Sequence, residues 1–164
     1  MQVRPAARSV TPAIPERFTL RRVLVAFDGS PGAWAALDRA IAVAVGQRAL
    51  LTIAGVVQEP RVWTALGPAP MPFTRESLLR DLEREMEQKL AAARDEVPAM
   101  VSVTTRLLHG RPGQVLAALA DEGDFDLVVA GPRPDGRLRR LLGHSVTHTL
   151  LSRCHTSVLA VKAP

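Results

Sequence analysis

The sequence predicts an α/β domain built on a doubly wound, five-stranded parallel sheet with helices on both faces. Five short apolar segments alternate with segments whose apolar residues recur at helical spacing. Most of these apolar segments are nearly continuous in Val, Leu, Ile and Ala, which is typical of strands covered by helices on both faces. The chain has 164 residues and is 47% hydrophobic, which is enough for the core of one domain.

The strands are expected where the apolar segments fall, at 23–27, 50–57, 101–108, 127–130 and 157–161. Four of the segments, those that begin at residues 23, 50, 127 and 157, contain few polar residues, so we expect these strands to be buried. The third segment alternates polar and apolar residues more regularly. It is therefore expected at an edge of the sheet.

The first helix is expected between the first two strands, with Pro31 near its start and Gly46 just past its end. Its apolar positions share helical spacing and are expected to form one buried face: Trp34, Leu37, Ile41 and Val45.

The second helix is expected at about 74–97, and it has a charged outer face opposite an apolar one. The apolar face consists of Leu79, Leu82, Met86, Leu90 and Ala93. The charged face carries two i,i+4 pairs, Glu76 with Arg80 and Glu85 with Lys89. We interpret those charges as a solvated surface.

Two shorter helices complete the pattern, one beginning near Pro112 and one near Ser145. Their apolar positions are Val115, Leu116 and Leu119 in the first, and Val146 and Leu150 in the second. The order is then strand and helix four times, followed by a last strand. Because parallel crossovers are right-handed, this order favours a doubly wound sheet with ligands beyond the carboxyl ends of the strands.

Composition narrows the class of protein. The single cysteine, Cys154, excludes an intrachain disulfide, and we expect it to be a buried thiol. The apolar runs are shorter than the roughly 20 residues of a membrane helix, so we expect a cytoplasmic protein without a membrane segment. Residues 1–20 lack the apolar core of a secretory signal and are expected to be a disordered leader, which leaves 21–164 as the domain.

The net charge of +5 does not predict a nucleic-acid partner. The basic residues are mostly arginines scattered among acids, and the aromatic content is only 4%. The Pro-rich stretch 60–72 is a long connection for which a lid, a partner surface and a packed surface loop are all open interpretations.

The segment 126–146 is the strongest indication of a binding site. An apolar strand ends at Gly131, a loop rich in Gly and Arg follows, and a helix then begins. Such a layout concentrates partial positive charge from backbone N–H groups and suits an anion. The first strand ends in Asp28, Gly29 and Ser30, and the two strand ends would adjoin if the strand order reverses between them. Both would then open into one crevice.

From about Arg21 to Lys162 the chain resembles the universal stress protein family. The resemblance rests on the order and spacing of VLVAFDGS (23–30), HGRPGQVL (109–116), DLVVAG (126–131), LLGHSV (141–146) and TSVLAVK (156–162). It implies a Rossmann-like, adenine nucleotide alpha hydrolase-like sheet of five strands with four helices. It also implies a homodimer formed through the last strand and a cytoplasmic role in stress, without an established general enzymatic activity.

One branch of that family binds ATP or a related adenine nucleotide through Gly-x-x-Gly, nine residues, and Gly followed by Ser or Thr. Aligned on this motif, Gly131 and Ser145 match, whereas Pro134 and His144 replace the second and third glycines. Pro134 removes an N–H donor, which costs about 1–3 kcal/mol if that donor was used. A Cβ at His144 costs roughly 1–2 kcal/mol if the backbone there is left-handed.

Other residues of this loop favour phosphate binding. Gly136 and Gly143 lie near the motif but out of register, and restore the loop only if its path differs. A guanidinium bond to phosphate supplies about 1.5–3 kcal/mol, enough to offset one defect. The candidates for this bond are Arg133, Arg137, Arg139 and Arg140. The alternative is that these arginines form a solvated basic loop without a ligand.

The resemblance also assigns Asp28 to the adenosine part of the ligand, although capping of the following turn explains it equally well. Val56 corresponds to a position that lines an adenine pocket, with an ordinary core role as the alternative. Ser145 suits either a phosphate contact or a helix N-cap.

Metal binding and catalysis are not expected. His144, His148, Cys154 and His155 cluster in the sequence, but no zinc-protease glutamate pattern and no paired CxxC accompanies them. No catalytic base is identified, so we do not expect an enzyme, with slow ATP hydrolysis as a third alternative. The leading hypothesis is a stress sensor that binds ATP or a related adenine nucleotide, with Mg²⁺, through a degenerate phosphate loop. The alternative is a nucleotide-free homodimeric module that recruits an unknown protein partner.

Overall fold

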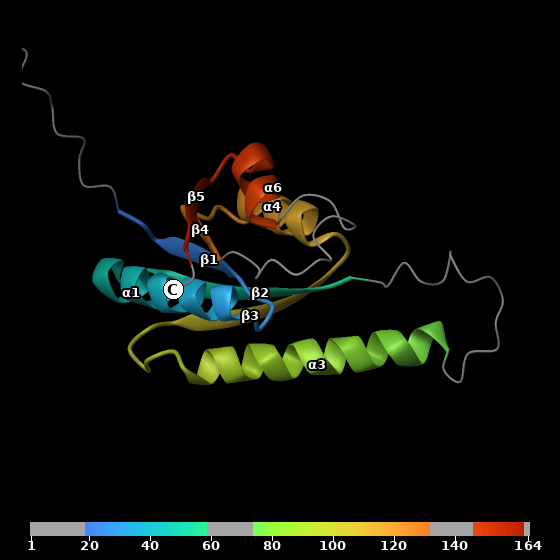
Figure 1. The fold of residues 1–164 in the computed structure, drawn as a ribbon. Coiled ribbons are helices and arrows are strands. Elements are labelled where there is room, and N and C mark those ends of the chain that lie inside the picture. The colour runs from blue at the N-terminus through green and yellow to red at the C-terminus, as the bar shows by residue number, and fades with distance from the viewer. Residues whose placement is uncertain (1–18, 59–73, 132–145, 163–164) are drawn as a thin grey trace, which may run out of the picture.

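The computed structural model describes residues 19–58, 74–131 and 146–162 and has the predicted α/β architecture (Figure 1). Its sheet has five strands in the order β3-β2-β1-β4-β5, and every neighbouring pair is parallel. The strands are β1 (Arg22–Ala26), β2 (Leu50–Val57), β3 (Val103–His109), β4 (Leu127–Ala130) and β5 (Ser157–Ala160). Successive strands proceed to one side from β1 to β3 and then to the other side through β4 and β5. The doubly wound prediction is therefore confirmed.

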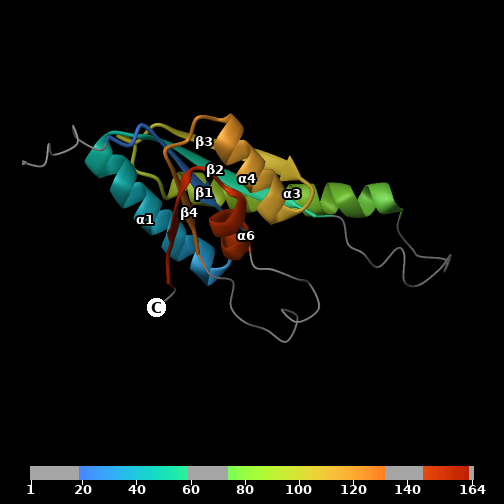
Figure 2. The ribbon, with the colours of Figure 1, turned by 90° about the horizontal axis from the view of Figure 1, so that it is seen from above.

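Helices cover both faces of this sheet. On one face lie α1 (Pro31–Gln47) and α3 (Arg75–Asp95), which connect β1 to β2 and β2 to β3; in Figure 1 α3 lies below the sheet and α1 crosses in front of it. On the other face lie α4 (Pro112–Glu122) and α6 (Val146–Arg153), which pack side by side (Figure 2). None of the helices in the described ranges is both long and apolar enough to cross a bilayer.

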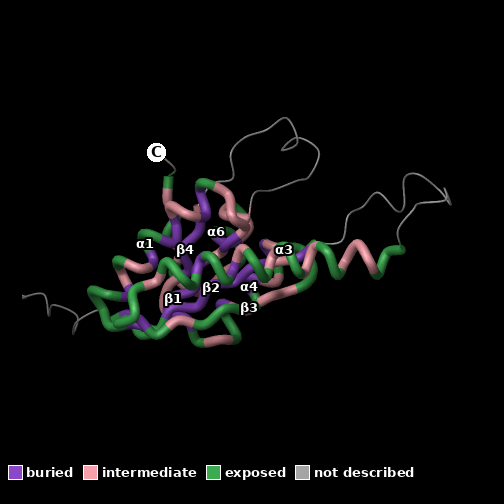
Figure 3. Tube along the Cα trace, turned by 90° about the horizontal axis from the view of Figure 1, so that it is seen from below, coloured by how far each residue is buried: buried purple, intermediate pink, exposed green. Residues whose placement is uncertain are grey.

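The core consists of two clusters separated by the sheet. Val23, Val25 and Ile53 point toward α1 and α3, whereas Leu24 and Val128 point toward α4 and α6. All five side chains are fully buried. Figure 3 shows the buried residues gathered along the central strands, with more exposure toward the N-terminal end of α3.

The buried face of α1 differs from the predicted one. Leu37 is fully buried as expected, but Val45 is 43% exposed, and Trp34 and Ile41 are only half-buried. The rest of the buried face consists of one glycine and four alanines: Gly32, Ala33, Ala36, Ala40 and Ala44. Small side chains allow the helix to lie close to the sheet, so the larger apolar residues flank the contact instead of forming it.

The predicted end of α1 is also corrected. Gly46 lies inside the last turn, and the helix ends at Gln47 with Arg48 as its C-cap. Arg48 adopts the left-handed conformation, with φ 55°, that was expected of a glycine, and its N–H donates to the Ala44 carbonyl.

The second predicted helix agrees more closely with the structure. Thr74 caps α3 by accepting the Ser77 N–H at 3.1 Å. Both expected ion pairs form on its outer face, Arg80 with Glu76 and Lys89 with Glu85. The apolar face is buried at its C-terminal end and half-buried earlier, where Leu79, Leu82 and Met86 lie.

The two edges of the sheet give one confirmation and one correction. β3 is an edge strand, as its alternating pattern predicted. β5 was expected to be buried, yet Leu159 is 39% exposed and Ala160 is exposed too. This strand is the opposite edge of the sheet, and α6 packs against it. The apolar residues of β5 therefore lie partly on a surface that this single chain leaves uncovered.

Candidate functional site

The candidate site lies where β1 and β4 end side by side. Their pairing runs from Val23 with Leu127 to Val25 with Val129, and Gly131 follows two residues after the last pair. β1 also pairs with β2, up to Ala26 with Ala54. The chain leaves β1 toward one face of the sheet and β4 toward the other, so this is the topological switch point at which α/β sheets bind ligands. The predicted adjacency of the two strand ends is confirmed.

The turn after β1 is organised by its own side chains. An Asp28 Oδ1 atom accepts the Ser30 N–H at 2.9 Å, and Gly29 between them has φ 80°, which favours glycine. Ser30 is the N-cap of α1, and its Oγ accepts the Ala33 N–H at 3.2 Å. Asp28 therefore fixes this turn, the structural role weighed for it from the sequence. The turn presents the first helical residues at the switch point.

Gly131 is held against the start of α1. A Cβ on Gly131 would lie 1.8 Å from the Gly32 carbonyl oxygen, so two bare backbones touch at this point. From the other side, the Thr147 hydroxyl in the first turn of α6 donates to the Gly131 carbonyl at 3.2 Å. The end of β4 is thus fixed between the starts of α1 and α6. The sequence contained a signal for this contact, a glycine at each of the two positions, but not the pairing between them.

Val56 lies two residues beyond the last β1–β2 pair, at the same level as Asp28. It is half-buried and packs against the core cluster on the α4 and α6 face. This position is consistent with the core role that was the alternative to lining an adenine pocket.

The remaining predicted site residues lie outside the described residues. They are Arg133, Gly136, Gly143, His144 and Ser145, together with Pro134 and the other arginines of the segment 132–145. The leader up to residue 18 and the Pro-rich stretch 60–72 also lie outside them.

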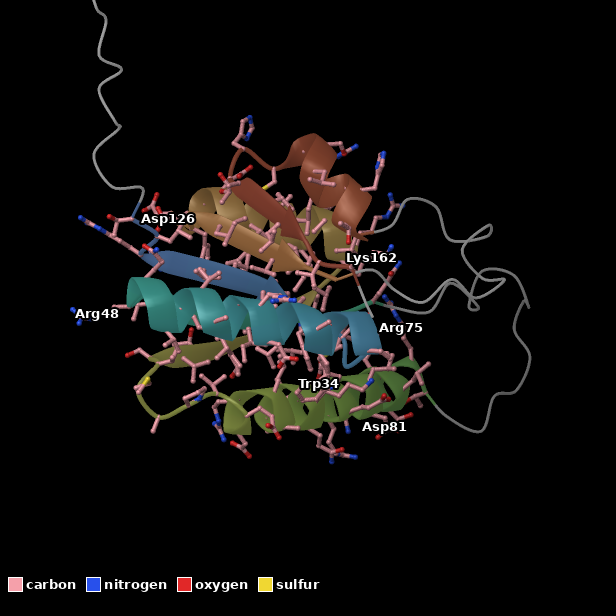
Figure 4. All side chains as sticks on the ribbon, turned by 60° about the vertical axis from the view of Figure 1, so that its left-hand side comes forward. Trp34, Arg48, Arg75, Asp81, Asp126 and Lys162 are labelled. Carbon is pink, nitrogen blue, oxygen red and sulfur yellow. The ribbon has the colours of Figure 1, made fainter. Side chains whose placement is uncertain are left out.

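An aromatic pair packs next to this turn. Phe27, buried next to Asp28, meets Trp34 of α1 edge-to-face, with ring centroids 4.9 Å apart and planes at 88°. Figure 4 shows Trp34 between α1 and α3. Lys89 of α3 also reaches this turn, because its stem packs against Gly29. The sequence predicts only a solvated ion pair for this lysine.

The cysteine and histidine residues near β5 form a structural cluster around Asp121. The carboxylate accepts the Cys154 thiol at 3.3 Å, the His155 ring at 3.1 Å, and the His155 and Thr156 N–H groups. The hydrogen bond from the His155 ring lowers the pKa of Asp121 to about 2. Burial raises the pKa of Cys154, so its half-buried thiol stays protonated. Within the described segments, no three His, Cys, Asp or Glu side chains are arranged to hold a metal ion.

Comparison with known proteins agrees with this geometry. Residues 19–162 match the model of the universal stress protein family. The chain belongs to this family. A putative universal stress protein of Staphylococcus haemolyticus is 28% identical over 148 residues, which cover 88% of this chain and 86% of that protein.

Solved structures show the same fold in other universal stress proteins. A universal stress protein in complex with cAMP is similar with a TM-score of 0.67 and 28% identity, over 89% of this chain and 99% of that one. A family member from Burkholderia pseudomallei gives a TM-score of 0.68 and 25% identity, over 89% and 98% of the two chains. This universal stress protein therefore has the adenine nucleotide alpha hydrolase-like fold, with strand order 3-2-1-4-5.

Proposed function

We propose that this universal stress protein is a cytoplasmic sensor that binds ATP or a related adenine nucleotide, with Mg²⁺, where β1 and β4 end. The observation that carries the proposal is the convergence of the Asp28 turn, Gly131 and the starts of α1 and α6 at one switch point. A similar structure, 28% identical, is a complex with cAMP. Binding and not bond breaking is the proposed activity.

The two strand ends suit different parts of a nucleotide. Asp28 places a carboxylate beside a tight turn, which suits the hydroxyl groups of a ribose and repels phosphate. Gly131 has no side chain, so the end of β4 lies directly against the first turn of α1 and next to its backbone N–H groups. We therefore place the adenosine part at the end of β1 and the phosphates beyond β4. This arrangement also keeps the phosphates near the starts of α1 and α6, whose dipoles favour negative charge.

Asp28→Ala is expected to weaken ATP binding by at least about tenfold, because a hydrogen bond to a charged group contributes about 1.5–3 kcal/mol. Calorimetric titration with ATP and Mg²⁺ measures the change. Asp38→Ala is the matched control, since Asp38 is an exposed carboxylate on α1 that leaves the turn intact. Native protein that neither releases heat nor gains thermal stability at millimolar nucleotide would contradict the proposed function.

The rival proposal is a nucleotide-free homodimeric module, and the exposure of β5 favours its dimeric part. The Val161 N–H donates inward to the Ala130 carbonyl, so in a parallel ladder Val158 and Ala160 direct their backbone groups to the outer edge. Leu159 on this strand and Leu151 on α6 are also exposed. We propose that a second copy pairs along β5. The rival predicts the same dimer with a melting temperature that nucleotide does not change.

A further inference from the structure

One face of α3 lies against bare backbone at the carboxyl ends of two neighbouring strands. A Cβ on Gly55 in β2 would lie 2.6 Å from the Met86 sulfur, and one on Gly29 would lie 3.0 Å from Cδ of Lys89. Met86 and Lys89 are three residues apart, so they share this face of the helix. The helix thus brings a lysine directly onto the turn that holds Asp28.

Lys89 differs from the other paired cations of α3. Its side chain is 39% exposed, whereas the exposed fractions of the others are 55–67%: Arg80, Arg84 and Arg94. The covered part is the stem, because its Cγ and Cε atoms both lie 3.4 Å from the Cβ position of Gly29. The ammonium group is one bond further on, and it donates to Glu85 Oε1 at 2.6 Å. The stem is therefore fixed at the site, while the charge is held by an exposed carboxylate.

A ligand phosphate can replace Glu85 as the acceptor of the Lys89 ammonium group. The hydrogen bond from Lys89 and its charge lower the pKa of Glu85, so this carboxylate is ionised at neutral pH. Glu85 is 59% exposed, and an exposed ion pair of this kind contributes little stability. A phosphate is a stronger acceptor for an ammonium group than a solvated carboxylate on the same helix, because it carries more negative charge. An anionic ligand beside Gly29 would also need a cation to balance Asp28.

We propose that Lys89 is a ligand-binding residue of the candidate site, and that its ammonium group exchanges Glu85 for a phosphate of the bound nucleotide. This inference rests on the proposed function. It adds a cation from the β2–β3 crossover helix to a site otherwise built from β1, β4 and the starts of α1 and α6. With its stem at Gly29, the Lys89 ammonium offsets the negative charge of Asp28, so that a phosphate can also approach from the β1 side.

Lys89→Met tests the inference, because methionine keeps an unbranched apolar stem against Gly29 and removes the charge. We expect ATP affinity, measured by calorimetry with Mg²⁺, to fall about tenfold or more, with the melting temperature of the free protein unchanged. Glu85→Gln releases Lys89 from its partner and is expected to tighten binding severalfold. Arg80→Met is the matched control: it removes the cation of the other i,i+4 pair on α3 and is expected to leave the affinity unchanged.

The outcomes separate this inference from the proposed function. If the native protein binds ATP and Lys89→Met binds it equally well, Lys89 is not a ligand-binding residue although the site is real. If Lys89→Met loses affinity only together with several degrees of melting temperature, its role is packing against Gly29, and the inference is also wrong. If the native protein binds no ATP, the proposed function is wrong and the role of Lys89 is lost with it.

Discussion

The Gly131→Ala variant is expected to lose about 3 kcal/mol of unfolding free energy, the upper end of what overpacking usually costs. The added Cβ would lie 1.8 Å from the Gly32 carbonyl oxygen and 2.3 Å from its carbonyl carbon. These are backbone atoms in the first turn of α1, so no side-chain rotation relieves the clash. Gly131 does not have a positive φ, so the effect comes from the contact and not from the backbone conformation.

Thermal unfolding followed by circular dichroism measures this loss, which corresponds to a melting temperature lower by roughly 6–12 °C for a domain of this size. Gly46→Ala is the matched control. Apart from its chain neighbours and the backbone of its own helix, no atom of the described residues lies within 4 Å of its Cβ position. Alanine is also the better helix former, so we expect a gain of about 0.5 kcal/mol. Equal melting temperatures for the two variants would show that the end of β4 does not rest on α1.

The Leu37→Ala variant is expected to lose about 2–5 kcal/mol of unfolding free energy. Leu37 is fully buried and is the largest side chain on a buried face that consists otherwise of alanine and glycine. Its removal leaves a cavity that the small neighbouring side chains do not fill. The same helix begins at Ser30, so loosening it also weakens the turn that positions Asp28. Urea denaturation measures the change in unfolding free energy.

Val45→Ala on the same helix is the control for Leu37→Ala. Its side chain is 43% exposed, so we expect a change within about 0.5 kcal/mol. This pair of variants also decides between two descriptions of α1. The apolar spacing in the sequence predicts that Leu37 and Val45 are buried alike, whereas the structure separates them. Similar losses for both variants would show that the sequence-based face is the right one.

The architecture was predictable because hydrophobic periodicity determines it directly. Runs such as 23–27 and 127–130 have the apolar character of central strands, and the helix after each one makes the parallel order nearly unavoidable. The alternation within 101–108 also placed that strand correctly at an edge. The prediction that strand 157–161 is buried is wrong, because apolar character does not reveal whether this chain or another molecule covers a strand.

Close packing was less predictable. A prediction from helical spacing gives most weight to large apolar residues. It therefore placed Val45 on the buried face of α1 in place of the alanines that line this face. It also treated Arg48 as an ordinary residue and Gly46 as the helix stop, although the left-handed position falls on Arg48. Propensities predict which residue adopts such a conformation most easily, not which residue the tertiary structure places there.

For the candidate site, the sequence predicted which strand ends meet but not what surrounds them. The order of the elements was sufficient to bring Asp28 and Gly131 together at a switch point. The contact of Gly131 with Gly32 and the packing of Lys89 on Gly29 depend on helix positions in three dimensions. The i,i+4 spacing of Glu85 and Lys89 predicts a solvated ion pair. It carries no information about where the apolar stem of the lysine packs.

The central claim is that an adenine nucleotide binds at the carboxyl ends of β1 and β4, and amide chemical-shift mapping by nuclear magnetic resonance tests it most directly. On saturation with ATP and Mg²⁺, we expect the amides of Gly29, Ser30 and Gly131 to shift. The amides of Arg48 and Asp126 should stay in place, because these residues lie at the opposite end of the sheet (Figure 4). Shifts confined to that opposite end, or no shifts at saturating nucleotide, would contradict the account.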